Sequence, residues 1–477
     1  MSLNLDRNIF RMYDIRGEVG KNLTEDVVNL IGRAYGIKLK EKIKKENLKV
    51  SIGHDARLSS EKFSKALIDG ITSQGIDVIF LGLIPTPVLY FSLFNLPVDG
   101  GIMITGSHNP PQFNGMKICI GKETIYGEEI QEIYKIAREY KREDGLKKGN
   151  VENFDILSVY KDYLVKEFSK GPIKELKEKT LKIVIDSGNG CGGLVIPEVL
   201  RKLGVDVIDL FSEPDGNFPN HHPDPTIVET LTVLKETVLK EKADFGVAYD
   251  GDADRIGIID ENGEVVYGDK LTYIFGKDIL RDHPSGKIIG EVKCSKTLFD
   301  GIEKLGGIPI LSPVGHSLIK KRLREENALL AGEMSGHIFF NDRYYGYDDA
   351  LYSTLRLTEI YAREKLRNPN FKFSQLLLDL PKVYVSPEIR IHCPDEKKFE
   401  VIKNILPQLE KKYPEIYKDV KKVITIDGVR IEFSDGWALA RASNTEPVIV
   451  MRFEAESEEK LNLYRKVFEE LLTEDNL

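Results

Sequence analysis

The chain has 477 residues, of which 41% are hydrophobic and 30% are charged. With 68 basic residues against 76 acidic ones the net charge is −8, so there is no basic excess to neutralise a nucleic-acid backbone, and we exclude a general nucleic-acid binder. The length predicts three or four domains, and no apolar run approaches the ~18 residues of a membrane span.

Four cysteines are scattered along the chain without a Cys-x-x-Cys pair, which indicates reduced thiols rather than a zinc or redox site. They are Cys119, Cys191, Cys294 and Cys393. The amino terminus also lacks the apolar core of a signal peptide. We therefore expect a soluble, cytoplasmic protein that has no membrane partner.

Three stretches repeat one order of strand, helix, glycine and strand. The first contains a strand at 49–53, a helix at 60–73 and a strand at 75–80. The other two place the same elements at 181–186, 196–203 and 204–208, and at 287–290, 297–305 and 306–311. Such units predict right-handed parallel crossovers.

Each repeat is followed by a further strand that ends in a loop of polar residues. These loops begin at Thr105, Asp250 and Gly332. Ligands of open α/β sheets bind outside the carboxyl ends of the strands, so we expect the three loops to face one central cleft. The prediction is an α/β fold of three similar mixed α/β domains with parallel crossovers, followed by a different C-terminal domain. The predicted domain limits are 1–154, 155–262, 263–372 and 373–477.

The C-terminal domain is predicted to be antiparallel α+β. After a charged helix at 396–411, short apolar runs alternate with Asp427-Gly428 and Asp435-Gly436, and Asp-Gly between such runs is a strong hairpin signal. A last strand at 448–453 leads to a helix at 457–472, for which Ser457 is the predicted N-cap.

Asp250, Asp252 and Asp254 follow an apolar strand and place three carboxylates on alternate residues. Such carboxylates repel one another unless a cation binds them, and hard oxygen ligands suit Mg²⁺. An EF-hand is an alternative because Glu261 falls at loop position twelve, but Arg255 stands where that motif requires glycine. The second alternative is a solvated acidic turn.

The loop that begins at Thr105 presents the hydroxyl of Ser107, a candidate nucleophile or phosphate carrier. His108 is its neighbour, and Lys117 follows a few residues later. A phosphate on Ser107 would carry about −1.5 to −2 charges. A cation on the aspartates, together with Arg255, would neutralise that charge during in-line transfer. A capped turn without chemistry is the alternative.

Two more loops carry groups suited to a phosphorylated polyol, although each would also suit a polar surface turn. Glu333 and Ser335 are two residues apart, so in an extended loop they project to one side, where they would read hydroxyl groups. Lys293 and His316 add cationic or polar groups to the same predicted domain. The fourth loop resembles a phosphate clamp made of Arg441, Ser443, Asn444 and Thr445. Near the amino terminus, Tyr13 and Arg16 are placed to reach into the cleft.

With these residues in view, the chain resembles the α-D-phosphohexomutase superfamily, in particular its phosphomannomutase/phosphoglucomutase branch. Six motifs occur in the family's order over nearly the whole length. They run from Phe10 to Gly17, Thr105 to Pro110, Asp215 to Pro225, Asp250 to Arg255, Gly332 to His337 and Arg441 to Pro447. Gly106 stands where alanine is common in relatives, and Ala253 where glycine is frequent; both changes are small for small.

The resemblance implies four domains around one cleft, and an isomerase that interconverts hexose 1-phosphate and hexose 6-phosphate of glucose or mannose. Ser107 would be the phosphorylated serine, and a hexose 1,6-bisphosphate would be both intermediate and activator. Mg²⁺ would be bound by the Ser107 phosphate and the three aspartates. Lys117 would be a general acid/base assisted by His337 and His108, with Arg255 also at the transferring phosphate. The predicted substrate ligands are Tyr13, Arg16, Lys293, His316, Glu333, Ser335, Arg441, Ser443, Asn444 and Thr445.

Three other functions stay open at this point. A phosphoglucosamine mutase would use the same machinery, although Met334 favours the mannose/glucose branch, since the glucosamine branch usually has glutamine there. A metal-dependent phosphatase would use an aspartate nucleophile from the Asp250 loop, and a non-catalytic protein would bind sugar phosphates without turnover. The expected partners are small sugar phosphates, and the expected state is a monomer or a small homo-oligomer.

Overall fold

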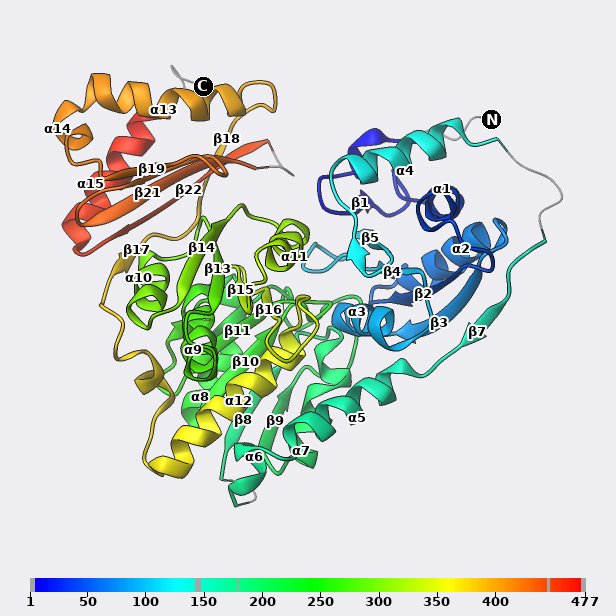
Figure 1. Cartoon of the computed structure of the whole chain (residues 1–477), viewed down its shortest axis with the longest axis horizontal. Helices are drawn as coiled ribbons and strands as arrows, with labels where there is room; N and C mark the ends of the chain where they lie inside the picture. The colour runs from blue at the N-terminus through cyan, green and yellow to red at the C-terminus, as the bar shows by residue number, and fades with distance from the viewer. Residues whose placement is uncertain (1–4, 142–146, 178–179, 444–446, 473–477) are drawn as a thin grey trace. The chain divides into compact units, whose positions relative to one another are not determined.

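A computed structural model describes residues 5–141, 147–177, 180–443 and 447–472 of the chain (Figure 1). It forms two compact units. The first comprises Met1–Leu271 and Ser335–Leu376, and the second comprises Thr272–Met334 and Leu377–Leu477. In the described part of the chain, no helix combines the length and the apolar character of a membrane span.

The first sheet of unit 1 has the order β1-β5-β4-β2-β3-β7, with β6 paired to β5. Its strands are β1 (Ile15–Glu18), β2 (Lys49–His54), β3 (Asp77–Leu83), β4 (Gly100–Ile104), β5 (Phe113–Ile120), β6 (Glu123–Thr124) and β7 (Val151–Asn153). Three of them, β4, β2 and β3, are neighbours in parallel, so their carboxyl ends share one edge. On the other side of β4, β5 runs antiparallel and returns from that edge.

Helices cover both faces of this first sheet, as Figure 1 shows. They are α1 (Glu25–Ile43), α2 (Ser60–Thr72), α3 (Thr86–Asn95) and α4 (Glu128–Glu139). Residues of α1, α2 and α4 join one apolar cluster with alternate residues of β2 and β4, whereas α3 contacts β2 and β4 from outside that cluster. Since helices cover the two faces, polar groups can be placed at the edge of the sheet where β4, β2 and β3 end.

The second sheet of unit 1 has the order β12-β11-β10-β8-β9. Its strands are β8 (Lys182–Asp186), β9 (Asp206–Leu210), β10 (Phe245–Tyr249), β11 (Ile256–Asp260) and β12 (Val265–Val266). The same part of the chain also forms the helices α5 (Ile156–Phe168), α6 (Pro172–Glu175), α7 (Ile196–Lys202) and α8 (Thr232–Glu241). Strand β10 is buried along its whole length, parallel to β8 and antiparallel to β11. Unit 1 also contains β16 (Ile338–Phe340) and α12 (Ala350–Arg367), and α9 (Gly268–Asp282) leads out of it.

In unit 2, β13 (Lys287–Glu291) pairs in parallel with both β14 (Ile308–Ser312) and β15 (Leu330–Gly332). Two helices, α10 (Lys296–Lys304) and α11 (His316–Glu325), connect these strands. The three predicted repeats are thus confirmed as β2–α2–β3, β8–α7–β9 and β13–α10–β14, each a parallel strand pair joined through a helix.

The C-terminal part of unit 2 is an antiparallel sheet, as predicted. Its strands are β17 (Tyr384–Val385), β18 (Ile389–His392), β19 (Lys422–Ile424), β20 (Val429–Glu432), β21 (Gly436–Ala442) and β22 (Val448–Ala455). The helices are α13 (Lys398–Lys412), α14 (Pro414–Tyr417) and α15 (Glu458–Leu471) (Figure 1). Residues of α13 and α15 join one apolar cluster with residues of the sheet. Both predicted Asp-Gly turns join antiparallel neighbours.

Candidate functional site

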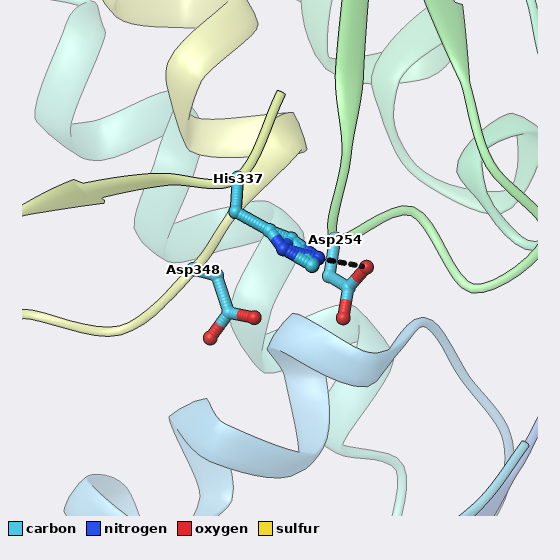
Figure 2. Close-up of side chains that lie close together, drawn as sticks. All are labelled: Asp254, His337 and Asp348. Atoms are coloured by element: carbon cyan, nitrogen blue, oxygen red, sulfur yellow. Dashed lines mark ion pairs between the residues drawn. The ribbon is translucent and has the colours of Figure 1, made fainter. Parts of the chain in front are cut away.

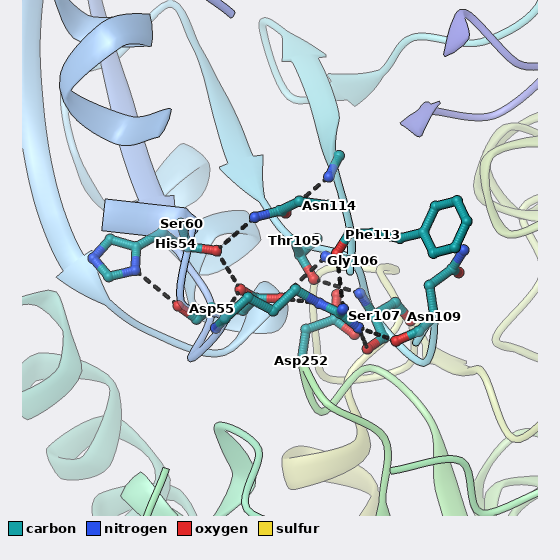
Figure 3. Close-up of polar contacts among 12 residues, drawn as sticks. His54, Asp55, Ser60, Thr105, Gly106, Ser107, Asn109, Phe113, Asn114 and Asp252 are labelled. Atoms are coloured by element: carbon teal, nitrogen blue, oxygen red, sulfur yellow. Dashed lines mark hydrogen bonds and ion pairs between the residues drawn. The ribbon is translucent and has the colours of Figure 1, made fainter. Parts of the chain in front are cut away.

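The serine loop leaves the buried strand β4 at Ile104 and folds back on itself at once. The backbone N–H of Ser107 donates to Thr105 Oγ1 at 2.8 Å, and the N–H of Gly106 donates to Asp55 Oδ2 at 3.1 Å (Figure 3). Ser107 adopts the left-handed backbone region with φ +48, and only 2% of the residue is exposed. Local hydrogen bonds therefore turn the chain sharply and hold the hydroxyl at the end of the strand.

The aspartate loop leaves β10 at the corresponding edge of the second sheet. Asp250, Asp252 and Asp254 are all fully buried, and one carboxylate oxygen from each lies within 4.8 Å of the others. The two loops approach through Gly251, where an added Cβ would lie 2.6 Å from the carbonyl oxygen of Ser107. A glycine at this position allows the two backbones to meet.

The two loops share one hydrogen-bonded cluster. The hydroxyl of Ser107 donates to Asp250 Oδ2 at 2.7 Å. The ammonium of Lys117 contacts Asp252 Oδ2 at 2.9 Å and also Asp254 Oδ2. Lys117 lies on β5 directly opposite Met103 of β4, so the antiparallel return brings it beside the serine loop. The convergence of serine, lysine and three carboxylates follows from the strand arrangement of both sheets.

Burial and mutual repulsion set the charges of this cluster. Burial raises the pKa of Asp250 well above its ordinary value, and the charges of Asp252 and Asp254 raise it further. Burial opposes the ionisation of Asp252 as well, but the charge of Lys117 and a hydrogen bond from Thr86 outweigh it and lower the pKa of Asp252. Burial disfavours the charge of Lys117, yet Asp252 and Asp254 hold its pKa above the ordinary value. All three carboxylates can therefore be ionised together only if positive charge, such as that of Lys117 or a bound cation, lies beside them.

The same three carboxylates fit a divalent cation. Among the described residues, Asp252 Oδ1 is a buried acceptor without a hydrogen-bond partner, which is costly unless some positive group binds it. Asp250 Oδ1 accepts from the backbone N–H groups of Asp254 and Arg255, both at 3.2 Å, and these bonds orient its carboxylate. Oxygen-only ligands at this spacing suit a hard cation such as Mg²⁺.

His337 joins this cluster from another part of unit 1, together with Asp348 (Figure 2). The Nε2 atom of His337 lies 3.5 Å from Asp254 Oδ1 and 3.1 Å from Nε of Arg255. Its position follows from a backbone bond in which the N–H of Ile256, the first residue of β11, donates to the carbonyl of Gly336 at 3.1 Å. An acid/base-capable imidazole therefore lies beside a candidate metal ligand, between two carboxylates.

Arg16 and His108 lie beside the serine loop. Arg16, on β1, contacts the carbonyl oxygen of Gly106 and Asn109 Oδ1, the latter at 2.7 Å, while its Nε donates to Asp14 at 2.8 Å. His108 Nδ1 lies 3.2 Å from Ser107 Oγ. Burial, together with the charges of Arg255 and Arg16, holds the pKa of His108 well below its ordinary value, so its imidazole is neutral at neutral pH. Tyr13, which directly precedes Asp14 in the chain, is half-buried.

Unit 2 contains five of the remaining predicted ligands, namely Lys293, His316, Glu333, Arg441 and Ser443. Lys293 forms an ion pair with Glu388 at 3.2 Å, and Glu333 accepts from the N–H of Gly315 at 2.8 Å, next to His316 at the start of α11. Asp427 Oδ2 accepts from Arg441 Nε at 3.1 Å and from the N–H of Val314 at 3.0 Å. Ser443 accepts at its carbonyl from Lys398, at 2.6 Å. Ser335 belongs to unit 1 and is half-buried, and Asn444 and Thr445 lie outside the described residues.

Several residues of these clusters escaped the sequence analysis. Asp55 and Arg57 follow β2, and Thr86 follows β3, at the same edge as the serine loop. Their position is itself a signal in the sequence, because polar groups collect at the carboxyl ends of parallel strands. Asp348 and Asp427 carried no such signal, because their contacts depend on tertiary structure.

Family models match the chain in four consecutive parts. The models describe phosphoglucomutase/phosphomannomutase α/β/α domains I, II and III and the C-terminal domain, and they match residues 7–144, 158–263, 267–384 and 388–471 respectively. Together they span most of the chain in the order expected from the motifs.

Full-length relatives and solved structures agree with these matches. A Pseudomonas aeruginosa phosphomannomutase/phosphoglucomutase is 41% identical over 97% of this chain and 95% of its own length. A Neisseria gonorrhoeae phosphoglucomutase is 40% identical over 98% and 97%. The crystal structure of a phosphoglucomutase/phosphomannomutase family protein from Burkholderia thailandensis has a TM-score of 0.87 and 38% identity, covering 98% of this chain and 97% of its own. The chain therefore belongs to the phosphoglucomutase/phosphomannomutase family and is a hexose phosphate mutase, an isomerase.

Proposed function

We propose that this mutase interconverts hexose 1-phosphate and hexose 6-phosphate of glucose and mannose through a phosphoserine at Ser107. The observation that carries the proposal is the 2.7 Å contact between Ser107 Oγ and Asp250 inside a buried triad of carboxylates. A serine held against a candidate metal site is suited to carry a phosphate whose charge the site neutralises. The names of relatives at about 40% identity support both sugars.

In the first step a hydroxyl oxygen of the sugar phosphate attacks the phosphorus of phosphoserine. The bond from phosphorus to the sugar oxygen forms while the bond to Ser107 Oγ breaks, and the product is a hexose 1,6-bisphosphate. Lys117 is the proposed general acid/base, assisted by His337 and His108. As an ammonium, Lys117 would give a proton to the departing Ser107 Oγ, while the hydroxyl proton of the sugar would pass to an assisting imidazole. After the bisphosphate reorients, Ser107 Oγ attacks its other phosphate and releases the isomeric monophosphate. Free hexose 1,6-bisphosphate would act as the activator that loads Ser107.

We assign the metal site to Mg²⁺, bound by Asp250, Asp252, Asp254 and an oxygen of the Ser107 phosphate. When bound, the ion would act as a Lewis acid that neutralises charge on the transferring phosphoryl group. Arg255 would contribute to the same charge balance from the other end of the aspartate loop. Its position 3.1 Å from the His337 ring supports this assignment.

The sugar and its second phosphate are assigned to the remaining loops. Glu333 and Ser335 would read sugar hydroxyls, and Lys293 and His316 would lie beside them. The phosphate that is not transferred would bind to Arg441, Ser443, Asn444 and Thr445, and Tyr13 and Arg16 would help at the serine loop. We propose the domain limits 1–154, 155–262, 263–372 and 373–477, so that each domain contributes one loop to one sugar.

The reaction needs no macromolecular partner, and we propose a monomer or a small homo-oligomer. All four cysteines, which lie in the described part of the chain, are buried thiols outside any disulfide. Such thiols fit a reducing compartment, and this supports the cytoplasm as the location.

The decisive variant is Ser107→Ala. We expect it to lose nearly all mutase activity, at least about a thousandfold, because removal of a covalent nucleophile abolishes the phosphoenzyme route. Intact-mass analysis of the unaltered protein, incubated with glucose 1,6-bisphosphate and Mg²⁺, should show one added phosphate that peptide mapping places on Ser107. Full activity in Ser107→Ala would instead favour an aspartate-nucleophile phosphatase.

Coupled assays with three substrates test the sugar class. Glucose 1-phosphate and mannose 1-phosphate should both be converted in the presence of the bisphosphate activator. Turnover of glucosamine 1-phosphate alone would identify a phosphoglucosamine mutase, and ligand binding without any turnover would identify a binding protein.

A further inference from the structure

One guanidinium holds the serine loop by its backbone. The terminal nitrogens of Arg57 donate to four carbonyl oxygens of the segment that carries Ser107. Nη1 reaches Pro110 at 2.8 Å and Phe113 at 2.9 Å, and Nη2 reaches Ser107 at 2.8 Å and Asn109 at 2.5 Å. All four terminal N–H groups are thus used within one short loop.

Arg57 is itself fixed by its surroundings. It is 3% exposed, and its Nε lies 3.3 Å from Asp55 Oδ2. The other oxygen of Asp55 accepts from the backbone N–H of Arg57 at 3.0 Å and from the hydroxyl of Ser60 at 2.6 Å. Asp55 also accepts from the N–H of Gly106, so a single carboxylate ties the arginine to the start of the serine loop.

The Asp215–Pro225 motif, which the assignment of catalytic roles leaves unused, supplies the other side of this arrangement. The ring of Phe218 lies 5.3 Å from the Arg57 guanidinium carbon, within cation–π range. An added Cβ at Gly216 would lie 2.5 Å from the carbonyl oxygen of Ala56, so this segment packs directly against the Arg57 backbone. Phe218 is 8% exposed and has φ +49, which indicates that packing holds it in an uncommon conformation.

Resting on the function proposed above, we infer that Arg57 is a positioning residue, which Asp55 and Phe218 orient and which keeps the Ser107 loop in the conformation for phosphoryl transfer. The loop needs such support because Ser107 adopts a left-handed conformation that its own side chain does not favour. Arginine suits the role because its planar fork can bond several carbonyls in fixed directions, which a lysine ammonium cannot do. Through these carbonyls Arg57 acts on the nucleophile without touching the phosphate.

Arg57→Lys tests this inference, since it keeps the charge and removes the fork. In-line transfer is sensitive to small displacements, so we expect kcat to fall about a hundredfold. The KM for glucose 1-phosphate should stay within about twofold, because no ligand of the sugar is removed. The rate at which glucose 1,6-bisphosphate phosphorylates Ser107, followed by intact mass, should fall together with kcat. Hydrogen exchange at the amides of residues 106–109 should become faster.

Arg356→Lys is the matched control. Arg356 is also a buried arginine of unit 1, 2% exposed, and it binds the carboxylate of Asp342 at 2.9 and 2.8 Å. We expect a similar loss of thermal stability from this variant but an unchanged kcat. Phe218→Leu is the milder second variant, which leaves every hydrogen bond of Arg57 in place and should lower kcat about two- to fivefold.

Two results would overturn the inference. One is a folded Arg57→Lys protein with kcat and Ser107 phosphorylation rate within twofold of the unaltered protein. The other is an equal loss of kcat in Arg356→Lys, which would indicate a general effect of stability. If the unaltered protein accepts no phosphate on Ser107, the proposed function is wrong. If the unaltered protein and Arg57→Lys are phosphorylated at the same rate, only the positioning role of Arg57 is wrong.

Discussion

Asp252 shows how one side chain decides what the candidate metal site can bind. Its Oδ2 accepts from Thr86 Oγ1 at 2.6 Å and from Lys117 at 2.9 Å, which leaves Oδ1 as the oxygen available to a cation. Thr86 is fully buried just after β3, and its own backbone N–H donates to the carbonyl of Asp252 at 2.9 Å. A two-point contact of this kind orients a ligand as outer-shell partners of metal sites do.

Thr86→Val should therefore weaken metal binding more than it weakens the fold. Loss of such an outer-shell hydrogen bond costs about 10- to 100-fold in metal affinity, so Mg²⁺ or Mn²⁺ binding measured by titration calorimetry should weaken by at least about tenfold. Thr86→Ser keeps the hydroxyl and should restore the affinity.

Thr72→Val is the matched control at this scale. Thr72 is equally buried, but its hydroxyl donates to the helix carbonyl of Ile68 at 2.8 Å, within α2. The metal affinity of the Thr72→Val variant should equal that of the unaltered protein. Unchanged binding in Thr86→Val would show that Asp252 needs no orientation from this side.

At the scale of elements, helix α15 illustrates how far local sequence controls structure. Ser457 accepts from the N–H of Lys460 at 3.3 Å, as its predicted N-cap role requires. The predicted helix started one residue earlier and ended one residue later than α15 does, since an N-cap residue lies just outside the helix. Small differences of this kind occur at most predicted ends.

Ser457→Ala should destabilise this helix by about 1 kcal/mol, because it removes the acceptor for a first-turn amide. Hydrogen exchange at the amides of the first turn of α15 should become faster, while the amides of β8 in unit 1 keep their protection. Ser457→Asp retains an acceptor and should leave the exchange rates near those of the unaltered protein. Equal exchange in the alanine variant would contradict the capping role.

At the scale of the whole molecule, the proposed phosphate clamp is the part that would act on the same substrate as Ser107. Arg441 lies on β21 of the C-terminal sheet and is held by Asp427 in the described part of the chain. A clamp that holds the second phosphate would also keep the bisphosphate bound while it reorients, and it would limit attack by water. Both the binding of the sugar phosphate and the share of phosphate lost to water should therefore depend on Arg441.

Arg441→Ala should raise the KM for glucose 1-phosphate about 10- to 100-fold, since a hydrogen bond to a charged group contributes about 1.5–3 kcal/mol. It should also raise the ratio of inorganic phosphate released to sugar phosphate isomerised, measured in one assay mixture. Arg465→Ala removes an exposed arginine of the same unit, paired with Glu469 on α15, and should change neither quantity. An unchanged KM in Arg441→Ala would remove the clamp assignment.

The repeated strand–helix–strand units, the antiparallel C-terminal sheet and the family could all be predicted from the amino-acid sequence. These depend on short-range signals: hydrophobic periodicity, Asp-Gly turns, and motifs whose residues are neighbours in the chain. The aspartate triad and Ser107 could be selected because each lies in a single loop after a buried strand.

The contacts between these groups, in contrast, depend on how distant segments of the chain pack. The strand-end rule could select Arg57 and Thr86 as polar residues of interest, but the atoms that they contact depend on strand order, which places β2, β3 and β4 side by side. Likewise, Asp348 reaches His337 and Asp254 through packing between distant segments. Burial then sets the charges, because removal of water raises the pKa of Asp250 and leaves Asp252 Oδ1 as a buried acceptor that a cation would satisfy.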